Sequence, residues 1–380
     1  MKRIVRTVAA ALVAATCMVG FASCSKKDKT FKIGLSGPLT GAAAIYGQGV
    51  ENSAKMAIEE INAAGGLNGV MFELVSLDDE NDATKVETNY SEMVSRGVHA
   101  TLGCVTTKPA LEFKALADED KMFFMTPSAT EDLIPDGKTG FQMCFSNSNQ
   151  GTAAALYVNE SYKGQTIGVL YRSDDAYSTG ILNKFKESLD SSIKLTEASF
   201  TGDTPTTLES QVAILKDCKF IFMPIYYTPA TLFIKQAKGT VAADAVYYGC
   251  DGLDGIASAE GFKINDYTQE ISMLSQFNSE ATEGKAKEFI DKYTTKYGKD
   301  TLNQFGASAY DCVYAIYEAM KAAGDRINVD MTYDEICPIL AEKLCSSDFT
   351  FSGVTGSSIQ WDAQGYVHKE ATKYIVKAKS

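Results

Sequence analysis

After residue 30, the chain alternates between short apolar runs and longer segments with apolar residues every three or four positions. The short runs predict buried strands, and the longer pattern predicts amphipathic helices. In the first half, the predicted strands are 31–35, 72–77, 100–103 and 122–125, and the predicted helices are 50–61, 83–94 and 109–116. Strands separated by helices of this length form βαβ units around a parallel sheet.

The same alternation starts again near residue 150 and predicts a second parallel sheet. Its predicted helices are 150–162, 177–189, 207–215 and 231–237, and its predicted strands are 166–171, 194–198, 220–224 and 245–249. The remainder is mostly helical, at 283–296, 308–323 and 333–344, and closes with a predicted hairpin of 358–361 and 366–376, turned at 362–365. The sequence therefore predicts two successive α/β halves with a cleft between them.

The first 23 residues have the composition of an export signal. Residues 1–6 carry three positive charges, and residues 8–22 form an apolar run that is too short for a membrane span of about 20 residues. Small residues then precede Cys24, which resembles a bacterial lipoprotein signal, although Phe21 stands where such signals usually have Leu. In those signals the Cys is acylated and becomes the mature N-terminus. The alternative is an ordinary cleaved signal.

Charge and composition exclude several classes of protein. The net charge is −12, and removing the signal, with its three basic residues and no acid, leaves −15, so binding to DNA or RNA is not expected. With His99 and His368 as the two histidines, we expect neither a metal site nor histidine-based catalysis. The glycine pattern at 47–52 has Asn52 where a dinucleotide fingerprint needs its third glycine, which argues against a dehydrogenase. We predict no cofactor and no enzymatic activity.

Cysteines of the exported body are widely spaced and form no CxxC pair. Export permits disulfides, so bridges and buried thiols both remain open. The cysteines considered are Cys104, Cys144, Cys218, Cys250, Cys312 and Cys345.

Hydroxyl-rich loops follow the third and fourth predicted strands. Thr106 and Thr107 lie in the first loop, and Ser128 and Thr130 lie in the second. In open parallel sheets, ligands bind beyond the carboxyl ends of strands, and the two loops should lie side by side. Hydroxyls and free N–H groups at helix starts suit a small carboxylate. The alternative is that Thr107 and Thr130 are only helix caps.

An acidic residue, Asp251, follows the strand predicted at 245–249 in the second half. A carboxylate at a strand end that faces the cleft is a counter-charge for an ammonium group. The alternative is a turn aspartate before Gly252, which is a common arrangement.

Several ordered segments resemble the type I periplasmic solute-binding proteins, specifically the leucine/isoleucine/valine-binding family. The segments are IGLSGPLTG (33–41) followed by YG (46–47), INAAGGLNG (61–69), LDD (77–79), TPSAT (126–130), and WD (361–362) with Gly365. Together they span nearly the whole exported chain. The resemblance implies two Rossmann-like lobes with parallel sheets, joined by a multi-strand hinge.

The resemblance also implies roles for individual residues. Thr107, or Thr106 because the loop differs in length, stands where the family has a Ser that binds the ligand's α-carboxylate. Ser128 and Thr130 match positions that bind carboxylate and ammonium, and Asp251 matches the acid that binds the ammonium. The aromatic positions expected to line the pocket are Tyr46, Tyr177, Tyr227 and Phe305.

One further family feature is absent near the acidic strand end. Leucine binders have a Cys there that pairs with a Cys before the serine loop. Here Cys104 has no such partner near Asn81, so that bridge is not expected.

The resemblance implies a lipid-anchored, exported and monomeric receptor. It would capture an amino acid, branched-chain or otherwise aliphatic, for the membrane permease of an ABC transporter. The alternatives are a sensory receptor with the same pocket, and a binder of a small amide or urea-type solute. The expected parts are a signal (1–23), a linker (24–30), an N-terminal lobe (31–147 plus 276–353) and a C-terminal lobe (148–275 plus 354–380).

Overall fold

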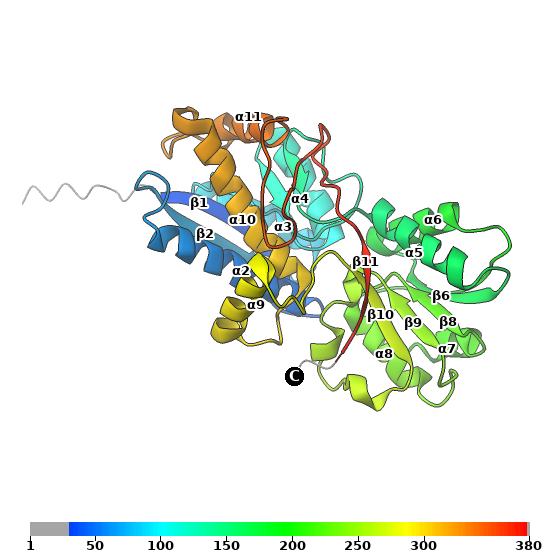
Figure 1. Ribbon diagram of the computed structural model, residues 1–380. Helices are drawn as coiled ribbons and strands as arrows, with labels where there is room; N and C mark the ends of the chain where they lie inside the picture. The colour runs from blue at the N-terminus through cyan, green and yellow to red at the C-terminus, as the bar shows by residue number, and fades with distance from the viewer. Residues whose placement is uncertain (1–29, 378–380) are drawn as a thin grey trace, which may run out of the picture.

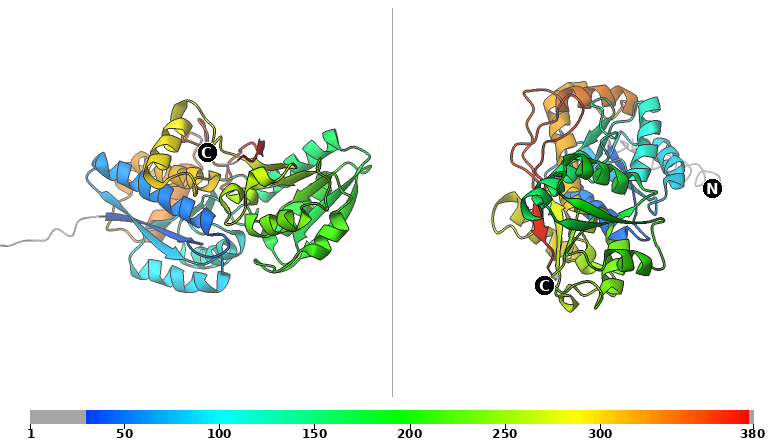
Figure 2. Two further views of the ribbon diagram at one scale, coloured as in Figure 1. Left: turned by 90° about the horizontal axis from the view of Figure 1, so that it is seen from below. Right: turned by 90° about the vertical axis from the view of Figure 1, so that its right-hand side faces the viewer.

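The computed structural model describes residues 30–377, which form two lobes, each built on one sheet (Figures 1 and 2). The predicted signal (1–23), the lipidation site Cys24 and the linker up to residue 29 lie outside the described residues. In Figure 1 the first lobe is on the left, and the second, built mainly from the green and yellow part of the chain, is on the right. The two predicted halves of the sequence are confirmed as two α/β units.

The first sheet has the strand order β2-β1-β3-β4-β5, and all its pairs are parallel. Its strands are β1 (Thr30–Gly37), β2 (Met71–Asp78), β3 (Ala100–Thr101), β4 (Phe124–Thr126) and β5 (Gly140–Gln142). The helices of this lobe are α2 (Ala44–Ala63), α3 (Val86–Ser95), α4 (Thr107–Asp120), α9 (Gly284–Tyr297), α10 (Gln304–Ala323) and α11 (Tyr333–Leu344). Helix α2 packs against α10, and α3 packs against α4.

The second sheet has the order β11-β10-β9-β8-β6-β7 and is parallel except for β11. Its strands are β6 (Thr166–Arg172), β7 (Lys194–Phe200), β8 (Phe220–Met223), β9 (Val246–Gly249), β10 (Glu270–Ser275) and β11 (Thr372–Ile375). The helices of this lobe are α5 (Asn147–Ser161), α6 (Ala176–Ser188), α7 (Glu209–Leu215) and α8 (Tyr227–Ala237). The exact lobe boundaries remain a prediction.

The closing hairpin is where the sequence prediction is wrong. Trp361 and Val367 form a single bridge beside the turn at Asp362, so the turn itself exists. The chain after it does not pair with 358–361, because β11 instead pairs antiparallel with β10. Strand β10 would otherwise be the open edge of the second sheet, and an open edge presents unpaired backbone groups that a further strand satisfies.

Three crossings join the lobes: residues 143–146 after β5, residues 276–283 after β10, and residues 345–371 before β11. One face of α10 forms hydrogen bonds with the second and third of them. Its polar members Gln304, Ser308 and Asp311 are spaced four and three residues apart, so they share one side of the helix, and all three are buried.

The first two crossings meet at Gln276. Its Oε1 accepts from Phe145 N at 2.8 Å, its Nε2 donates to Ser308 Oγ at 3.1 Å, and its own N–H donates to Gln304 Oε1 at 3.2 Å. The third crossing is held by Asp311, whose carboxylate accepts from Val354 N at 2.7 Å and Thr355 N at 2.8 Å. The second and third crossings are therefore bonded to α10, and the first is linked to that helix through Gln276.

Lys369 adds a further tie between the crossings. Its buried ammonium group donates to Met143 O in the first crossing, and to Thr355 Oγ1 at 2.6 Å in the third. Burial lowers the pKa of Lys369, and the nearby Asp311 carboxylate opposes that shift. The joint between the lobes thus contains a buried charge held by hydrogen bonds.

All the cysteines in the described part of the chain are free thiols. Cys337 belongs to this set, which makes it seven rather than the six considered from the sequence. Within residues 30–377 no helix has the length and apolar character needed to cross a membrane. The same residues contain no group of three or more His, Cys, Asp or Glu side chains that could hold a metal ion.

Candidate functional site

The two hydroxyl-rich loops of the first lobe lie side by side, as the sequence predicts. They follow β3 and β4, which are neighbours in the sheet. Thr126 Oγ1 donates to Cys104 O at 3.0 Å, and Ser128 Oγ donates to Val105 O. The first loop therefore rests on the second, with its hydroxyl side chains at the edge that faces the other lobe.

Thr106 and Thr107 carry the strongest sign of a ligand in the first lobe. Both residues are buried, and neither hydroxyl has a hydrogen-bond partner. Thr106 is the N-cap residue of α4, but its side chain makes no capping hydrogen bond. The Thr107 hydroxyl has no partner and so caps nothing either, which makes the helix-cap alternative wrong for Thr107. A buried hydroxyl without a partner is costly, so the pair is suited to a polar group that enters the cleft.

Asp251 occupies the facing turn of the second lobe, two residues after the end of β9, and is 2% exposed. Tyr177 donates its hydroxyl to Asp251 Oδ1 at 2.6 Å and accepts from Gly252 N at 2.9 Å. Asp251 N donates to Gln150 Oε1 at 2.9 Å. Burial raises the pKa of the Asp251 carboxyl to about 7, although the hydrogen bond from Tyr177 lowers it. A cation bound beside this carboxylate would offset the penalty of burying its charge.

Aromatic rings close the cavity between these two anchors. Tyr46, at the start of α2, donates its hydroxyl across the cleft to Gly252 O. Its ring meets the edges of Phe305, at 4.9 Å between centroids, and Tyr226, at 5.6 Å. A side chain at position 252 would meet the Tyr177 hydroxyl at 2.7 Å and Ile225 O at 2.9 Å, so the packing of this turn within its own lobe requires glycine.

The resulting cavity is small and is bounded by both lobes. It is lined by Tyr46, Val105, Thr106, Thr107, Ser128, Tyr177, Tyr226, Asp251, Gly252 and Phe305. Its volume is about 10 Å³, which is room for roughly one water molecule. The cavity as it stands is too small for an amino acid, so the lobes must open and Tyr46 must release Gly252 O before one can bind.

Most of the residues predicted from the sequence meet in this one cavity. They are Tyr46, Thr106, Thr107, Ser128, Tyr177, Asp251 and Phe305. Tyr227 packs behind Tyr46 with its N–H pointing at the Tyr46 hydroxyl, and its neighbour Tyr226 lines the cavity instead. Thr130 donates its hydroxyl to Asn147 Oδ1 at 2.7 Å and does not line the cavity.

Sequence reasoning missed Gln150 in particular. Gln150 is fully buried, and its Nε2 has no hydrogen-bond partner. It lies in the first turns of α5, where nothing in the spacing of apolar residues distinguishes it from a helix residue in the core. The adjacent pair Tyr226 and Tyr227 indicated an aromatic side chain at the cleft, but the sequence alone does not say which of the two rings faces it.

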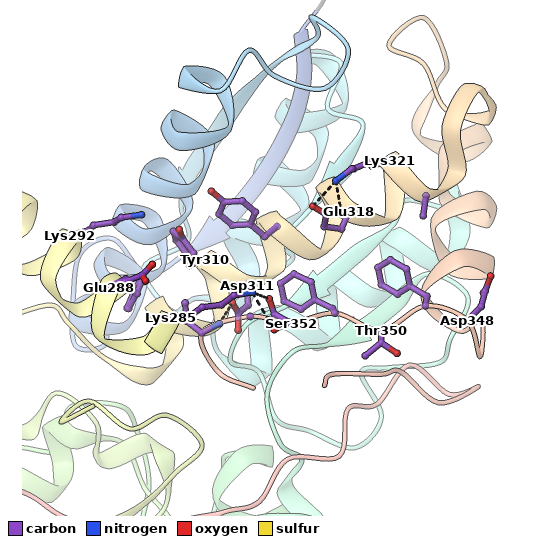
Figure 3. A pocket seen from close by; sticks show the side chains of 17 residues that line it. Lys285, Glu288, Lys292, Tyr310, Asp311, Glu318, Lys321, Asp348, Thr350 and Ser352 are labelled. Atoms are coloured by element: carbon purple, nitrogen blue, oxygen red, sulfur yellow. Dashed lines mark hydrogen bonds and ion pairs between the residues drawn. The ribbon is translucent and has the colours of Figure 1, made fainter. Parts of the chain in front are cut away.

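A larger hollow lies away from the cleft, between α9, α10 and residues 348–354 (Figure 3). Its volume is about 690 Å³. Several of its charged groups have partners: Lys321 pairs with Glu318, and Lys285 donates to the backbone and hydroxyl of Ser352 (Figure 3). None of its lining side chains is a buried polar group without a partner.

Comparison with known proteins agrees with this geometry. The model of the family described as "Periplasmic binding protein" matches residues 30–336. The chain is 30% identical over 324 residues to the leucine-, isoleucine-, valine-, threonine- and alanine-binding protein of Pseudomonas aeruginosa, and the match covers 83% of this chain and 84% of that protein.

Solved structures share the fold. The branched-chain amino acid transporter substrate-binding protein of Streptococcus pneumoniae, in complex with isoleucine, is 27% identical with a TM-score of 0.76, covering 91% of this chain and 95% of that one. A solute-binding protein of Rhodopseudomonas palustris, in complex with 3,4-dihydroxybenzoic acid, is 18% identical with a TM-score of 0.77, covering 92% and 93%. The second likeness concerns the fold alone, so the fold does not fix the ligand.

The matched family model, a relative whose match covers 83% of the chain, and the two-lobed architecture all agree with the resemblance found in the sequence. The chain belongs to the periplasmic binding protein family, type I, a family of solute-binding proteins rather than enzymes.

Proposed function

We propose that the protein is an extracytoplasmic receptor that binds an α-amino acid between its lobes and delivers it to the permease of an ABC transporter. The observation that carries this proposal is the pair of unpartnered hydroxyls on Thr106 and Thr107, which share a cavity with the buried carboxylate of Asp251. Hydroxyls on one lobe suit the α-carboxylate, and an acid on the other suits the α-ammonium group.

Binding and closure follow from the same arrangement. Each end of the zwitterion binds a different lobe, so a bound amino acid favours the closed form over the open one. Hydrogen bonds to charged groups contribute about 1.5–3 kcal/mol each, which is enough for micromolar affinity after the entropic costs. Tyr46, Tyr226 and Phe305 then surround the ligand side chain, in agreement with an aliphatic amino acid.

A thermal-shift screen of the purified protein tests the ligand class, because a ligand that binds the native state raises the melting temperature. The screen includes the standard amino acids, their amides, urea and simple carboxylic acids. We expect aliphatic amino acids to raise the melting temperature and their amides to have little effect. A shift with amides or urea alone would contradict the proposal and favour the alternative solute class.

Export and anchoring rest on the first residues of the chain. We infer that residues 1–23 direct export and that Cys24 is acylated, which holds a monomeric receptor at the membrane surface. Cys24→Ser should move the protein from the membrane fraction to the soluble exported fraction, as fractionation and immunoblotting would detect. A variant that stays with the membrane would contradict the anchor.

A further inference from the structure

The two lobes also touch at a place remote from the three crossings. The first crossing leaves from β5, at one edge of the first sheet, and β2 is the opposite edge. In the second sheet, the other crossings join at β10 and β11, and β7 is the opposite edge. The loops after β2 and β7 therefore lie on the side of the cleft opposite the joint, which we call the cleft mouth. Rotation of one lobe about the joint separates these loops most.

A single hydrogen bond joins the lobes at the cleft mouth. Asn81 Nδ2, in the loop after β2, donates to Asp203 Oδ1, in the loop after β7, at 3.2 Å. Asn81 (φ 64°) and its neighbour Glu80 (φ 53°) both have a left-handed backbone. The backbone N–H of Asn81 donates to Asp79 Oδ1 at 2.9 Å. Asparagine tolerates this conformation better than most residues, and the turn points its side chain at the second lobe.

Asp203 is held in place from its own lobe. Arg172, the last residue of β6, donates through Nη1 to Asp203 Oδ1 and through Nε to Asp174 Oδ1 at 2.8 Å. The Arg172 side chain is only 8% exposed, and the Asp203 side chain is 41% exposed. Buried Asp175, the N-cap of α6, adds a further negative charge beside Arg172. The second lobe therefore presents a fixed carboxylate that favours a neutral or positive donor on the first lobe and disfavours another anion.

We propose that Asn81 and Asp203 form a clasp across the cleft mouth that sets how tightly and how long the closed lobes retain their ligand. Neither residue lines the ligand cavity, so both are positioning residues: they act by stabilising the closed form in which Thr107 and Asp251 face each other. The clasp rests on the proposed function for the identity of the ligand, whereas the hydrogen bond between Asn81 and Asp203 does not depend on that function. Because closure gains this bond with any ligand, the clasp changes affinity for all ligands by the same factor.

Exchange of the two side chains tests the clasp. Asn81→Asp keeps the shape and the tolerance for a left-handed backbone but places a carboxylate against Asp203. The double variant Asn81→Asp/Asp203→Asn restores a donor and an acceptor in the reversed direction. Asn81→Gly removes the side chain without straining the backbone, and Asp203→Asn alone is the companion single variant. Asp244→Asn is the matched control, because Asp244 forms an exposed ion pair with Lys219 within the second lobe.

Amino-acid dissociation constants from calorimetry and dissociation rates from stopped flow give the first readout. For Asn81→Asp at 10 mM salt, we expect Kd to rise about tenfold, mostly through faster dissociation, and less at 1 M salt, where the Debye length falls from about 30 Å to 3 Å. Asn81→Gly should raise Kd about threefold, as expected for one partly exposed hydrogen bond. The double variant should return to within about twofold of the wild type, which a merely structural role would not produce.

Small-angle scattering without amino acid gives a readout that does not depend on the ligand. At low salt, Asn81→Asp should have a larger radius of gyration than the wild type, and the double variant should return to the wild-type value. Equal radii for all three proteins would overturn the clasp, as would a double variant that binds as weakly as Asn81→Asp. If the wild type binds no amino acid, the proposed function fails, and the scattering comparison still decides whether the clasp exists.

Discussion

The small cavity between the lobes is a better candidate for a ligand site than the large hollow beside α10, although volume alone would suggest the hollow. The hollow measures about 690 Å³ and the cleft cavity about 10 Å³. Yet no side chain that lines the hollow is a buried polar group without a partner, whereas the cavity holds two buried threonine hydroxyls without partners and a buried carboxylate. Buried polar groups without partners, rather than empty space, therefore distinguish the cleft cavity from the hollow.

The largest expected effect comes from removing the carboxylate of the cavity. Asp251→Ala should raise the Kd for an amino acid at least about 30-fold, because a buried ammonium group then loses its counter-charge. Calorimetry measures the affinity, and circular dichroism checks that the fold persists. An unchanged affinity in a folded variant would remove Asp251 from the site.

Thr107→Val should show that an unpartnered hydroxyl serves the ligand and not the fold. Valine keeps the shape without the hydroxyl, so we expect the Kd to rise about tenfold, in line with the loss of one hydrogen bond to a charged group. The melting temperature without ligand should stay the same or rise, since a buried polar group without a partner is removed. A fall in melting temperature with unchanged affinity would contradict this assignment. Thr106→Val then decides which of the two threonines contributes more.

The pH dependence of binding follows from the raised pKa of Asp251. The pKa moves from 3.8 to about 7 because the carboxyl is buried, so below pH 7 most of the protein carries the proton that an ammonium ligand must displace. Affinity should fall about tenfold from pH 8 to pH 6, with proton release visible by calorimetry in buffers of different ionisation enthalpy.

The same shift affects folding in the opposite direction. A carboxyl that binds its proton more tightly in the folded chain makes the ligand-free protein less stable as pH rises from about 4 to 7. Asp251→Asn should remove both dependences. Persistence of the pH dependence of binding in that variant would assign it to another group.

The smallest effect is expected in the large hollow. Lys321→Ala removes a half-exposed side chain whose ion pair with Glu318 lies on the surface of α10, and such pairs contribute about 0–1 kcal/mol. Both the melting temperature and the amino-acid affinity should stay close to the wild-type values, with Kd within about twofold. A loss of affinity here similar to that of Asp251→Ala would break the distinction between the two cavities.

The local pattern of apolar residues was enough to predict the elements that have a clear hydrophobic period and a clear terminal signal. Helix α11 has the predicted bounds 333–344, and its first turn carries the capping box of Thr332 and Glu335. Strand β5 is three residues long, too short to show any period, and was missed. The pairing of β11 was also wrong, because the partner of a strand depends on which sheet edge is open after the whole lobe has assembled.

In the candidate site too, the residues placed by local sequence position were predictable, and those placed by tertiary packing were not. Residues at strand ends, such as Thr107 and Asp251, were predictable because parallel sheets bring those ends to one edge. Which of the adjacent rings Tyr226 and Tyr227 faces the cleft depends on the rotation of the first turn of α8. Thr130 was misplaced because its hydroxyl has a nearer partner, Asn147, supplied by the next helix.

The polar face of α10 has a consequence for how such a molecule can change. Gln304 and Ser308 bind the second connecting segment and Asp311 binds the third, while the neighbouring Phe305 lines the cavity between the lobes. Substitutions that remodel recognition therefore need not disturb the machinery of movement. The hinge contacts and the binding surface use different residues of the same helix, so ligand specificity can change while the hinge stays the same.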